Sequence, residues 1–261
     1  WMGKPYVYDF DDAVYLPNVA EPNRLIGRLK CPGKAEWIIR GSRVTVAGNA
    51  CLAEYAKKTG ARNVQVVPTA LDTGRFVPPE KQWNRDTVVI GWIGSPTTIV
   101  FLEPFRKVIQ RLTERFGSGV EFRIVGGTLA EPLPAGVRCV EWSLETEVEQ
   151  LQSFDIGIMP MPDNEWTRGK CAFKAIEYLA VGIPAVCSPV GMNRQVVAEG
   201  VNGFLPEDDQ AWHEALCRLV EDKDLRRRLG KAGRQGVIEN YSLDRWAPVI
   251  ESILRRTAGV K

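Results

Sequence analysis

Histidine is nearly absent from this chain of 261 residues, which contains only His213. A Ser-His-Asp triad needs a histidine positioned as a general base. Because His213 stands on a polar helical segment beside Trp212, we expect it to be structural or solvated, and we exclude a hydrolase of that type. The six cysteines form no C-x-x-C pair, and several lie in apolar runs. Buried thiols are therefore expected, rather than disulfides or a metal site.

Long hydrophobic runs and a strong charge of one sign are also lacking. No apolar run reaches the roughly 18 residues of a membrane-spanning helix, and the first residues predict a strand rather than a signal peptide, so we expect a cytoplasmic protein. The net charge is +2, and no common nucleic-acid-binding signature occurs, so nucleic acid is not an expected partner. Six basic residues nevertheless lie between Arg24 and Arg43. They indicate either a solvated helix or peripheral contact with an anionic membrane.

Strand-like and helix-like segments alternate along the chain, which predicts an α/β protein with parallel sheets covered by helices. In the first part we expect strands at 6–8, 43–47 and 64–67. A helix is expected from Asn49, which can cap it, to Thr59, with Gly60 after its end. The second part is predicted to contain strands near 87–93, 121–125, 137–140, 155–159 and 184–187. Its helices are predicted near 100–116, 145–152, 171–180, 193–198, 208–220, 222–238 and 243–257.

Proline and polar residues in 77–86 predict a linker between two domains. We place an N-terminal domain in residues 1–84 and a second domain in residues 85–240. Residues 241–261 are expected to form a closing helix that packs back toward the first domain. A complete doubly wound domain has about six strands, and residues 1–84 offer only about half that number. We therefore expect the N-terminal domain to be incomplete.

The most informative segment is residues 169–191, GKCAFKAIEYLAVGIPAVCSPVG. It predicts one helix that carries Lys170, Lys174 and Glu177 on a single face, because they are four and three residues apart. Ammonium groups bind phosphate, and a carboxylate accepts hydrogen bonds from a diol. This face therefore suits a nucleotide sugar. The simpler interpretation is a surface helix with an exposed Lys174–Glu177 salt bridge that contributes little.

This segment and five others resemble, in the same order, the family 4 glycosyltransferases, whose GT-B fold has two Rossmann-like domains. The resemblance covers nearly the whole chain, in residues 68–78, 88–95, 122–127, 154–160, 169–191 and 226–242. It implies transfer of a sugar from a nucleotide sugar to a hydroxyl acceptor (a glycan, a lipid or a small molecule), with retention of the anomeric configuration. No cofactor is expected beyond the donor.

Two features depart from the family pattern. Gly169 stands where the family commonly has the first of two glutamates spaced eight residues apart, and Glu177 is the second. The usual basic pair after the first strand of the second domain is missing from residues 94–98. Lys170 and Lys174 can supply the displaced positive charge, so donor binding is expected to need no metal ion.

The carboxyl ends of parallel strands gather the ligand-binding loops of an α/β sheet. We predict that Lys170 and Lys174 stabilise the departing diphosphate and that Glu177 binds the ribose. Gly94 and Gly126 begin loops in which the backbone can approach phosphate closely. The remaining donor-binding residues expected at this edge are Ser95, Trp142, Pro160 and Gly169.

Asp9-Phe10-Asp11-Asp12 is a second acidic group, and it follows the first predicted strand. We predict that Asp11 or Asp12 orients the acceptor hydroxyl and include both as catalytic candidates. The alternative is a turn-forming or helix-capping cluster. Asp9-x-Asp11 also matches a metal-binding signature of the other large glycosyltransferase fold, but so short a match is common by chance.

Two other functions fit the same residues. One is a nucleotide-sugar epimerase of the same fold, which needs several acid/base groups near the sugar, where the donor loop offers only Asp163 and Glu165. The other is a module that binds a nucleotide without turnover.

Overall fold

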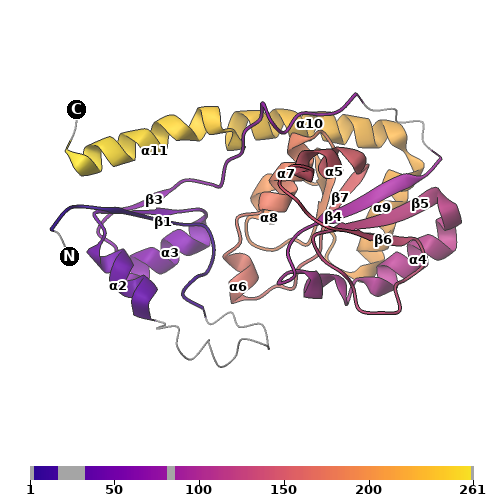
Figure 1. Cartoon of the computed structure of the whole chain (residues 1–261), viewed down its shortest axis with the longest axis horizontal. Helices are drawn as coiled ribbons and strands as arrows, with labels where there is room; N and C mark the ends of the chain where they lie inside the picture. The colour runs from indigo at the N-terminus through magenta and orange to yellow at the C-terminus, as the bar shows by residue number, and fades with distance from the viewer. Residues whose placement is uncertain (1–2, 17–32, 81–85, 260–261) are drawn as a thin grey trace. The chain divides into compact units, whose positions relative to one another are not determined.

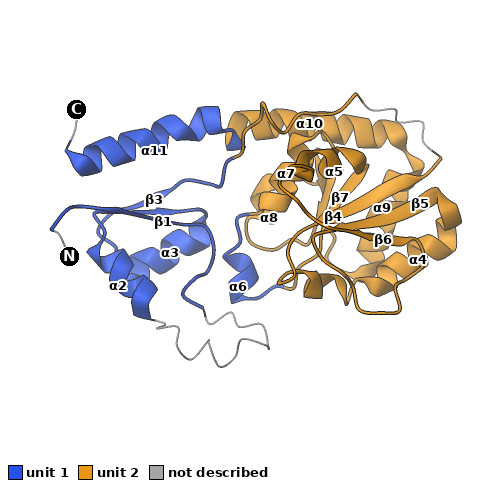
Figure 2. Cartoon of the chain, viewed as in Figure 1, with its two compact units in different colours: residues 1–70, 163–171, 241–261 blue, residues 71–162, 172–240 orange. Residues whose placement is uncertain are grey.

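The computed structural model of the chain describes residues 3–16, 33–80 and 86–259. The chain divides into two compact units, which are coloured separately in Figure 2. Unit 1 contains residues 1–70, 163–171 and 241–261, and unit 2 contains residues 71–162 and 172–240. The predicted domain boundary at residue 84 lies outside the described residues, as does the first part of the basic segment, through residue 32. Membrane contact by that segment stays a prediction.

Unit 1 is built on a parallel sheet of three strands in the order β1-β2-β3, as expected for this part of the chain. Helices α2 and α3 lie on one side of this sheet and α11 on the other (Figure 1). Val44 and Val46 of β2 and Ile253 of α11 contribute to its core. The elements are β1 (Val7–Phe10), α2 (Gly33–Gly41), β2 (Val44–Ala47), α3 (Ala50–Thr59), β3 (Val64–Val66), α6 (Glu165–Arg168) and α11 (Leu243–Ala258).

The limits of α3 confirm a prediction made from two residues. The Asn49 side chain accepts a hydrogen bond from the Leu52 N–H at 2.9 Å, which satisfies one backbone donor of the first turn. Gly60 ends the helix with φ at +96°, in the left-handed region that favours glycine. Local side-chain chemistry is therefore sufficient to set both ends of this helix.

Unit 2 contains a parallel sheet of six strands in the order β6-β5-β4-β7-β8-β9. Its strands are β4 (Val88–Ile93), β5 (Val120–Val125), β6 (Val137–Val140), β7 (Ile156–Met159), β8 (Ala185–Cys187) and β9 (Gly203–Phe204). Its helices are η2 (Ile99–Leu102), α4 (Arg106–Phe116), η3 (Gly117–Gly119), α5 (Glu147–Ser153), α7 (Phe173–Ala180), α8 (Asn193–Val196), α9 (Asp209–Glu221) and α10 (Lys223–Tyr241).

The strand order of unit 2 shows where a ligand would bind. The chain runs from β4 outward to β6 on one side of the sheet, and then from β7 outward to β9 on the other side. β4 and β7 therefore flank the switch point, and ligands of open α/β sheets bind outside the carboxyl ends of the strands there. Two predicted site residues follow these strands directly, Gly94 after β4 and Pro160 after β7.

The α/β fold class and its parallel sheets are confirmed, and the five predicted strands of unit 2 are present within one residue of their expected limits. The single helix predicted for 171–180 is wrong at its start, because α7 begins at Phe173. The helix predicted for 100–116 is two segments, η2 and α4.

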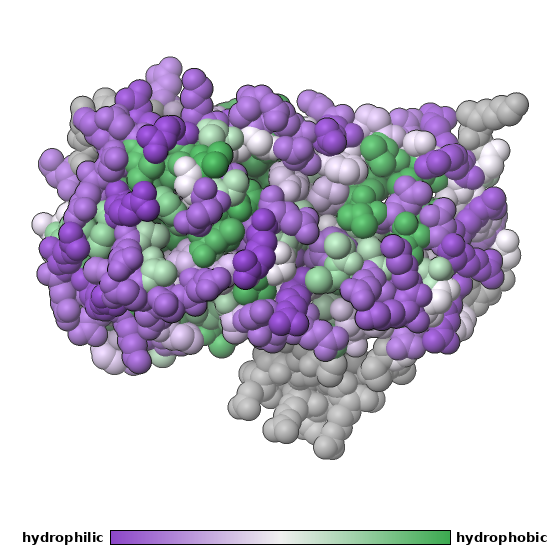
Figure 3. All heavy atoms as spheres, turned by 180° about the vertical axis from the view of Figure 1, so that it is seen from behind, coloured by the Kyte–Doolittle hydropathy of each residue, from purple (hydrophilic) through white to green (hydrophobic). Residues whose placement is uncertain are grey.

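On the face shown in Figure 3, hydrophilic side chains cover most of the surface and hydrophobic ones gather in separate patches. Among the described residues, none of the helices combines the length and the apolar character that crossing a membrane requires.

Candidate functional site

Helix α7 carries two predicted site residues, and Tyr178 fixes its position over the sheet. The Tyr178 hydroxyl accepts a hydrogen bond from the Ile93 N–H and donates one to the Ile158 carbonyl, both at 3.1 Å. The ring packs directly over Gly157 of β7, where a Cβ atom would lie 2.1 Å from it. A glycine is therefore required at this position for α7 to approach the switch point.

Glu177 is buried on α7, with 4% of its surface exposed. The exposed Lys174–Glu177 salt bridge of the simpler interpretation is therefore wrong. Burial, and to a smaller extent the charge of Glu147, raise the pKa of Glu177 to about 8, although the charges of Lys174 and Arg75 lower it in part. Within the described residues, no protein group is hydrogen-bonded to the Glu177 carboxyl group. Buried polar groups are usually hydrogen-bonded, so this carboxyl group is suited to a ligand.

Lys174 lies in the first turn of α7, next to the two glycine loops. Its Nζ is 5.7 Å from the centroid of the Trp92 ring, and a Cβ atom on Gly94 would lie 2.8 Å from its Cε. Gly126 in turn abuts the Gly94 carbonyl, with Trp142 beside it. Unit 2 thus brings together Gly94, Gly126, Trp142, Lys174 and Glu177, which the sequence had separated by up to 83 positions.

Sequence reasoning missed two charged residues of this cluster, Glu147 and Arg75. Arg75 Nη2 lies 3.2 Å from Glu147 Oε2, and the Trp142 Nε1–H donates to Glu147 Oε1 at 3.2 Å. Arg75 stands within residues 68–78, which already resembled the family. Glu147 had no comparable signal, because its partner Arg75 lies 72 positions away in the sequence.

Ser95 and Pro160 lie in loops that are ordered by their own hydrogen bonds. The Ser95 N–H donates to Thr98 Oγ1 at 3.3 Å, and its hydroxyl is 2.8 Å from Thr97 Oγ1. After Pro160, the Met161 N–H donates to Ser188 Oγ at 2.9 Å, which ties the loop after β7 to the end of β8. Contacts of these residues with a donor stay predictions.

The other predicted residues belong to unit 1, in which Lys170 is paired with Asp12. Lys170 Nζ lies 2.9 Å from Asp12 Oδ2 and 3.9 Å from the centroid of the Trp166 ring. The prediction that Lys170 shares a helix face with Lys174 and Glu177 is wrong. Ala172, with φ at +55°, stands between Lys170 and the start of α7.

A hydrogen-bonding side chain explains why this segment leaves the helical path. The Asn49 amide donates to the carbonyls of Gly169 and Lys170, at 2.9 and 3.1 Å. Cys171 follows, and its thiol donates to the Asp11 carbonyl at 3.1 Å. These contacts hold Gly169 and Lys170 against the first acidic loop of unit 1.

That acidic loop borders a cavity of about 500 Å³ within unit 1, lined by Asp9, Phe10, Asp11, Pro68, Leu243 and Trp246 among others. Burial raises the pKa of Asp9, and the neighbouring charge of Asp11 raises it further. Asp12 Oδ1 also accepts the Ala13 N–H at 2.9 Å, so part of the cluster forms a turn, as in the alternative considered above.

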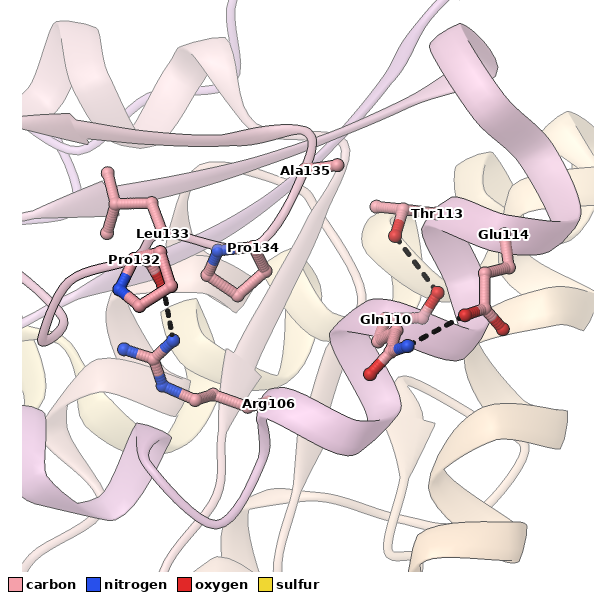
Figure 4. Close-up of a pocket in the computed structure, with 8 residues that line it drawn as sticks. All are labelled: Arg106, Gln110, Thr113, Glu114, Pro132, Leu133, Pro134 and Ala135. Atoms are coloured by element: carbon pink, nitrogen blue, oxygen red, sulfur yellow. Dashed lines mark hydrogen bonds between the residues drawn. The ribbon is translucent and has the colours of Figure 1, made fainter.

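A second cavity, of about 480 Å³, lies in unit 2 between α4 and residues 132–135 and contains no predicted site residue (Figure 4). The polar groups that line it bond to one another. Arg106 donates to the Pro132 carbonyl at 2.9 Å, and Gln110 donates to Glu114 at 2.8 Å. This internal pairing leaves the predicted residues at the switch point as the better candidate site.

The described cysteines are free, and Cys171, Cys187 and Cys217 are buried, whereas Cys51 is exposed. Cys31 lies outside the described residues. Within the parts of the chain that the structure describes, no three His, Cys, Asp or Glu residues are grouped so that they could hold a metal ion.

Replacing Gly126 with alanine is expected to destabilise unit 2 by about 1–3 kcal/mol, as for other residues forced into a sparsely populated backbone region. Gly126 has φ at +82°, and a Cβ atom there would lie 2.1 Å from the Gly94 carbonyl oxygen. Urea unfolding gives the change in stability. Gly236→Ala is the matched control, because a Cβ atom at that helical position meets nothing within 4 Å. Equal stability of the two variants would contradict the close approach of the two loops.

Most of unit 2 is similar to one family of known proteins. The family model described as "Glycosyl transferases group 1" matches residues 87–222. The chain is 30% identical over 193 residues to the D-inositol 3-phosphate glycosyltransferase of Corynebacterium urealyticum, which is 62% of this chain and 44% of that protein. It is 32% identical over 81 residues to spore coat protein SA of Bacillus subtilis, 30% of this chain and 21% of that protein. The chain thus spans less than half the length of these relatives.

Solved structures show the same fold at low sequence identity. Sucrose-phosphate synthase from Thermosynechococcus elongatus superposes with a TM-score of 0.71 at 16% identity, over 96% of this chain and 67% of that one. HepE of Anabaena, in complex with UDP and glucose, superposes with a TM-score of 0.70 at 14% identity, over 96% of this chain and 71% of that one. This likeness confirms the GT-B type of fold, with its two parallel α/β sheets.

Proposed function

We propose that this chain, which belongs to the group 1 glycosyltransferases, binds a nucleotide sugar in unit 2 and serves transfer of its sugar to a hydroxyl acceptor. The observation that carries the proposal is the buried Glu177 carboxyl group, which has no hydrogen-bond partner among the described residues and lies at the switch point of the sheet. A ribose diol would supply the missing hydrogen bonds.

Each group around Glu177 has a part in this proposal. Lys174, beside Gly94, would face the diphosphate and stabilise the negative charge that develops as it departs. Trp142, which is 47% exposed, would lie beside the base. The roles predicted for Asp11, Asp12 and Lys170 of unit 1, toward an acceptor and the diphosphate, stay predictions.

The neighbouring proteins support these classes of substrate. HepE has been crystallised with UDP-glucose, and TarM of S. aureus with UDP and glycan-type molecules. The corynebacterial relative is named for transfer to an inositol phosphate, which carries hydroxyl groups. Retention of anomeric configuration belongs to the proposal as well.

Product analysis with a radiolabelled nucleotide sugar tests the proposal. We expect label to move from the nucleotide sugar to a hydroxyl-bearing acceptor, or slowly to water when no acceptor is present. Conversion of the donor into an epimer would contradict the proposed reaction. Tight binding of a nucleoside diphosphate without any turnover would reduce the function to nucleotide binding.

Binding of a nucleoside diphosphate is expected to be unchanged by a chelator, because Lys174 and the start of α7 supply the positive charge that faces the phosphates. Calorimetric titrations with and without EDTA measure this. Loss of binding in EDTA, restored by Mn²⁺, would contradict the prediction and would direct attention to Asp9 and Asp11 as metal ligands.

A further inference from the structure

We propose that Glu147 is a positioning residue of the nucleotide site. It holds the Trp142 indole in the orientation in which the nucleoside base stacks on it. The inference rests on the function proposed above and adds the feature that recognises the base. Neither Glu147 nor its partner Arg75 carries a role in that function so far.

The contacts of Glu147 account for the orientation of the indole. One carboxylate oxygen accepts the Trp142 Nε1–H at 3.2 Å, and the other lies 3.2 Å from Arg75 Nη2. The Glu147 side chain is only 14% exposed, whereas Trp142 is 47% exposed. A largely buried, ion-paired carboxylate thus restrains an aromatic ring whose surface remains open to a ligand.

Arg75 is itself held in place by the backbone around it. Its Nη2 also donates to the Leu144 carbonyl at 3.0 Å. Arg234 of α10 donates to the Thr73 carbonyl at 2.6 Å and to the Ala180 carbonyl at 2.9 Å, and so ties the segment that carries Arg75 to the end of α7. Supporting bonds of this kind keep a binding group in one geometry before the ligand arrives.

The position of Trp142 fits a base that is joined to a ribose on Glu177. Trp142 lies beside Gly126, which abuts Gly94, and the side chain of Lys174 closes the other side of Gly94. Glu147 is also close enough to Glu177 for its charge to affect that carboxyl group. The same carboxylate therefore bonds to the proposed base surface and acts electrostatically on the proposed ribose ligand.

Calorimetric binding of UDP, ADP and inorganic pyrophosphate tests the inference on the intact chain. Trp142→Ala is expected to weaken binding of both nucleotides by about 5- to 150-fold, the usual contribution of stacking on an aromatic side chain. At a pH above 8, where Glu177 is ionised in every variant, Glu147→Gln is expected to weaken it by about 2- to 10-fold, because the amide loses the ion pair with Arg75 and holds the indole less firmly, so that the nucleotide must order it. Pyrophosphate, which has no base, should bind all variants equally. Glu149→Gln is the matched control, since Glu149 is exposed on the same helix, and it should change nothing.

Two further results are expected from Glu147→Gln. Combined with Trp142→Ala, it should add no further loss, because the ring that it orients is gone. The pH at which nucleotide affinity changes should also move to lower values, because only Lys174 and Arg75, both cations, would remain among the charges that act on Glu177. A residue that merely stabilises the fold would not produce that shift.

Equal losses for nucleotides and pyrophosphate, or full additivity in the double variant, would overturn the positioning role. Unchanged nucleotide affinity in Glu147→Gln would do the same and leave the proposed function intact. Failure of the unaltered chain to bind any nucleoside diphosphate would instead overturn the proposed function, and this inference with it.

Discussion

At a pH above 8, where the Glu177 carboxyl group is ionised, a Glu177→Gln variant is expected to bind a nucleoside diphosphate about 10- to 150-fold more weakly than the unaltered chain, which corresponds to roughly 1.5–3 kcal/mol for hydrogen bonds to a charged group. The buried carboxylate can accept two hydrogen bonds from the vicinal ribose hydroxyls, and the amide keeps its shape but not its charge. Wild-type affinity should also rise as the pH approaches and passes about 8, the pKa of Glu177, because the ionised form is the better acceptor. The affinity of the Gln variant should show no such rise with pH.

A 2′-deoxyribose nucleotide separates this role from a general disturbance of the site. It should bind the unaltered chain more weakly than the ribose form does, but should lose little more affinity for the variant. Strict additivity of the two changes would remove Glu177 from the ribose site.

The same substitution should increase the stability of unit 2 at neutral and alkaline pH. The folded pKa of about 8 lies above the ordinary value of 4.5, so the folded chain holds this proton more tightly than the unfolded chain does. The stability contributed by the protonated carboxyl group is complete below the ordinary value and is lost as the pH rises to about 8. Glutamine does not ionise. The free energy of unfolding of the variant should therefore rise relative to that of the wild type by up to about 3–5 kcal/mol as the pH increases from 4.5 to about 8. Urea unfolding of the variant and the wild type at pH 4.5 and pH 8.5 measures their difference in the free energy of unfolding. If that difference were the same at both pH values, the prediction would be contradicted.

Lys174→Gln is expected to lower kcat/KM for sugar transfer by about 10²- to 10³-fold, or roughly 3–4 kcal/mol of barrier, as for other preorganised charges at a developing anion. The ammonium group lies beside the Gly94 loop at the switch point, where the diphosphate is proposed to depart. Initial rates with a nucleotide sugar measure the loss. Lys107→Gln removes an exposed charge from α4 and serves as the matched control. An effect no larger than that of the control would show that Lys174 does not act on the leaving group.

Much of unit 2 could be predicted because its determinants are local. The apolar runs of β4 and β7 specify buried strands, and both strands are fully buried. Gly94 and Pro160 then follow at the carboxyl ends of those strands, where the topology itself gathers ligands. In unit 1, Asn49 and Gly60 define α3 through side-chain and backbone preferences that need no distant partner.

The errors at the candidate site concern contacts between distant positions. Lys170 leaves the helical path because Asn49, 121 positions earlier, binds its carbonyl. Glu177 is buried because α7 lies closely on Gly157, which charge spacing does not reveal. The Arg75–Glu147 pair depends on how the segment before β4 packs beside α5. The sequence around either residue does not indicate which residue it pairs with.

The chain passes between unit 1 and unit 2 four times, and one passage falls between Cys171 and Ala172. The next residue, Phe173, begins the helix that bears Lys174 and Glu177. The backbone connection from unit 1 into that helix thus runs through Ala172, which is in the left-handed region. Cutting the gene at a single point cannot separate the two units, because unit 1 consists of three stretches of sequence and unit 2 of two. Truncation to residues 71–240 would keep the whole of unit 2, but it would carry residues 163–171 of unit 1 along with it.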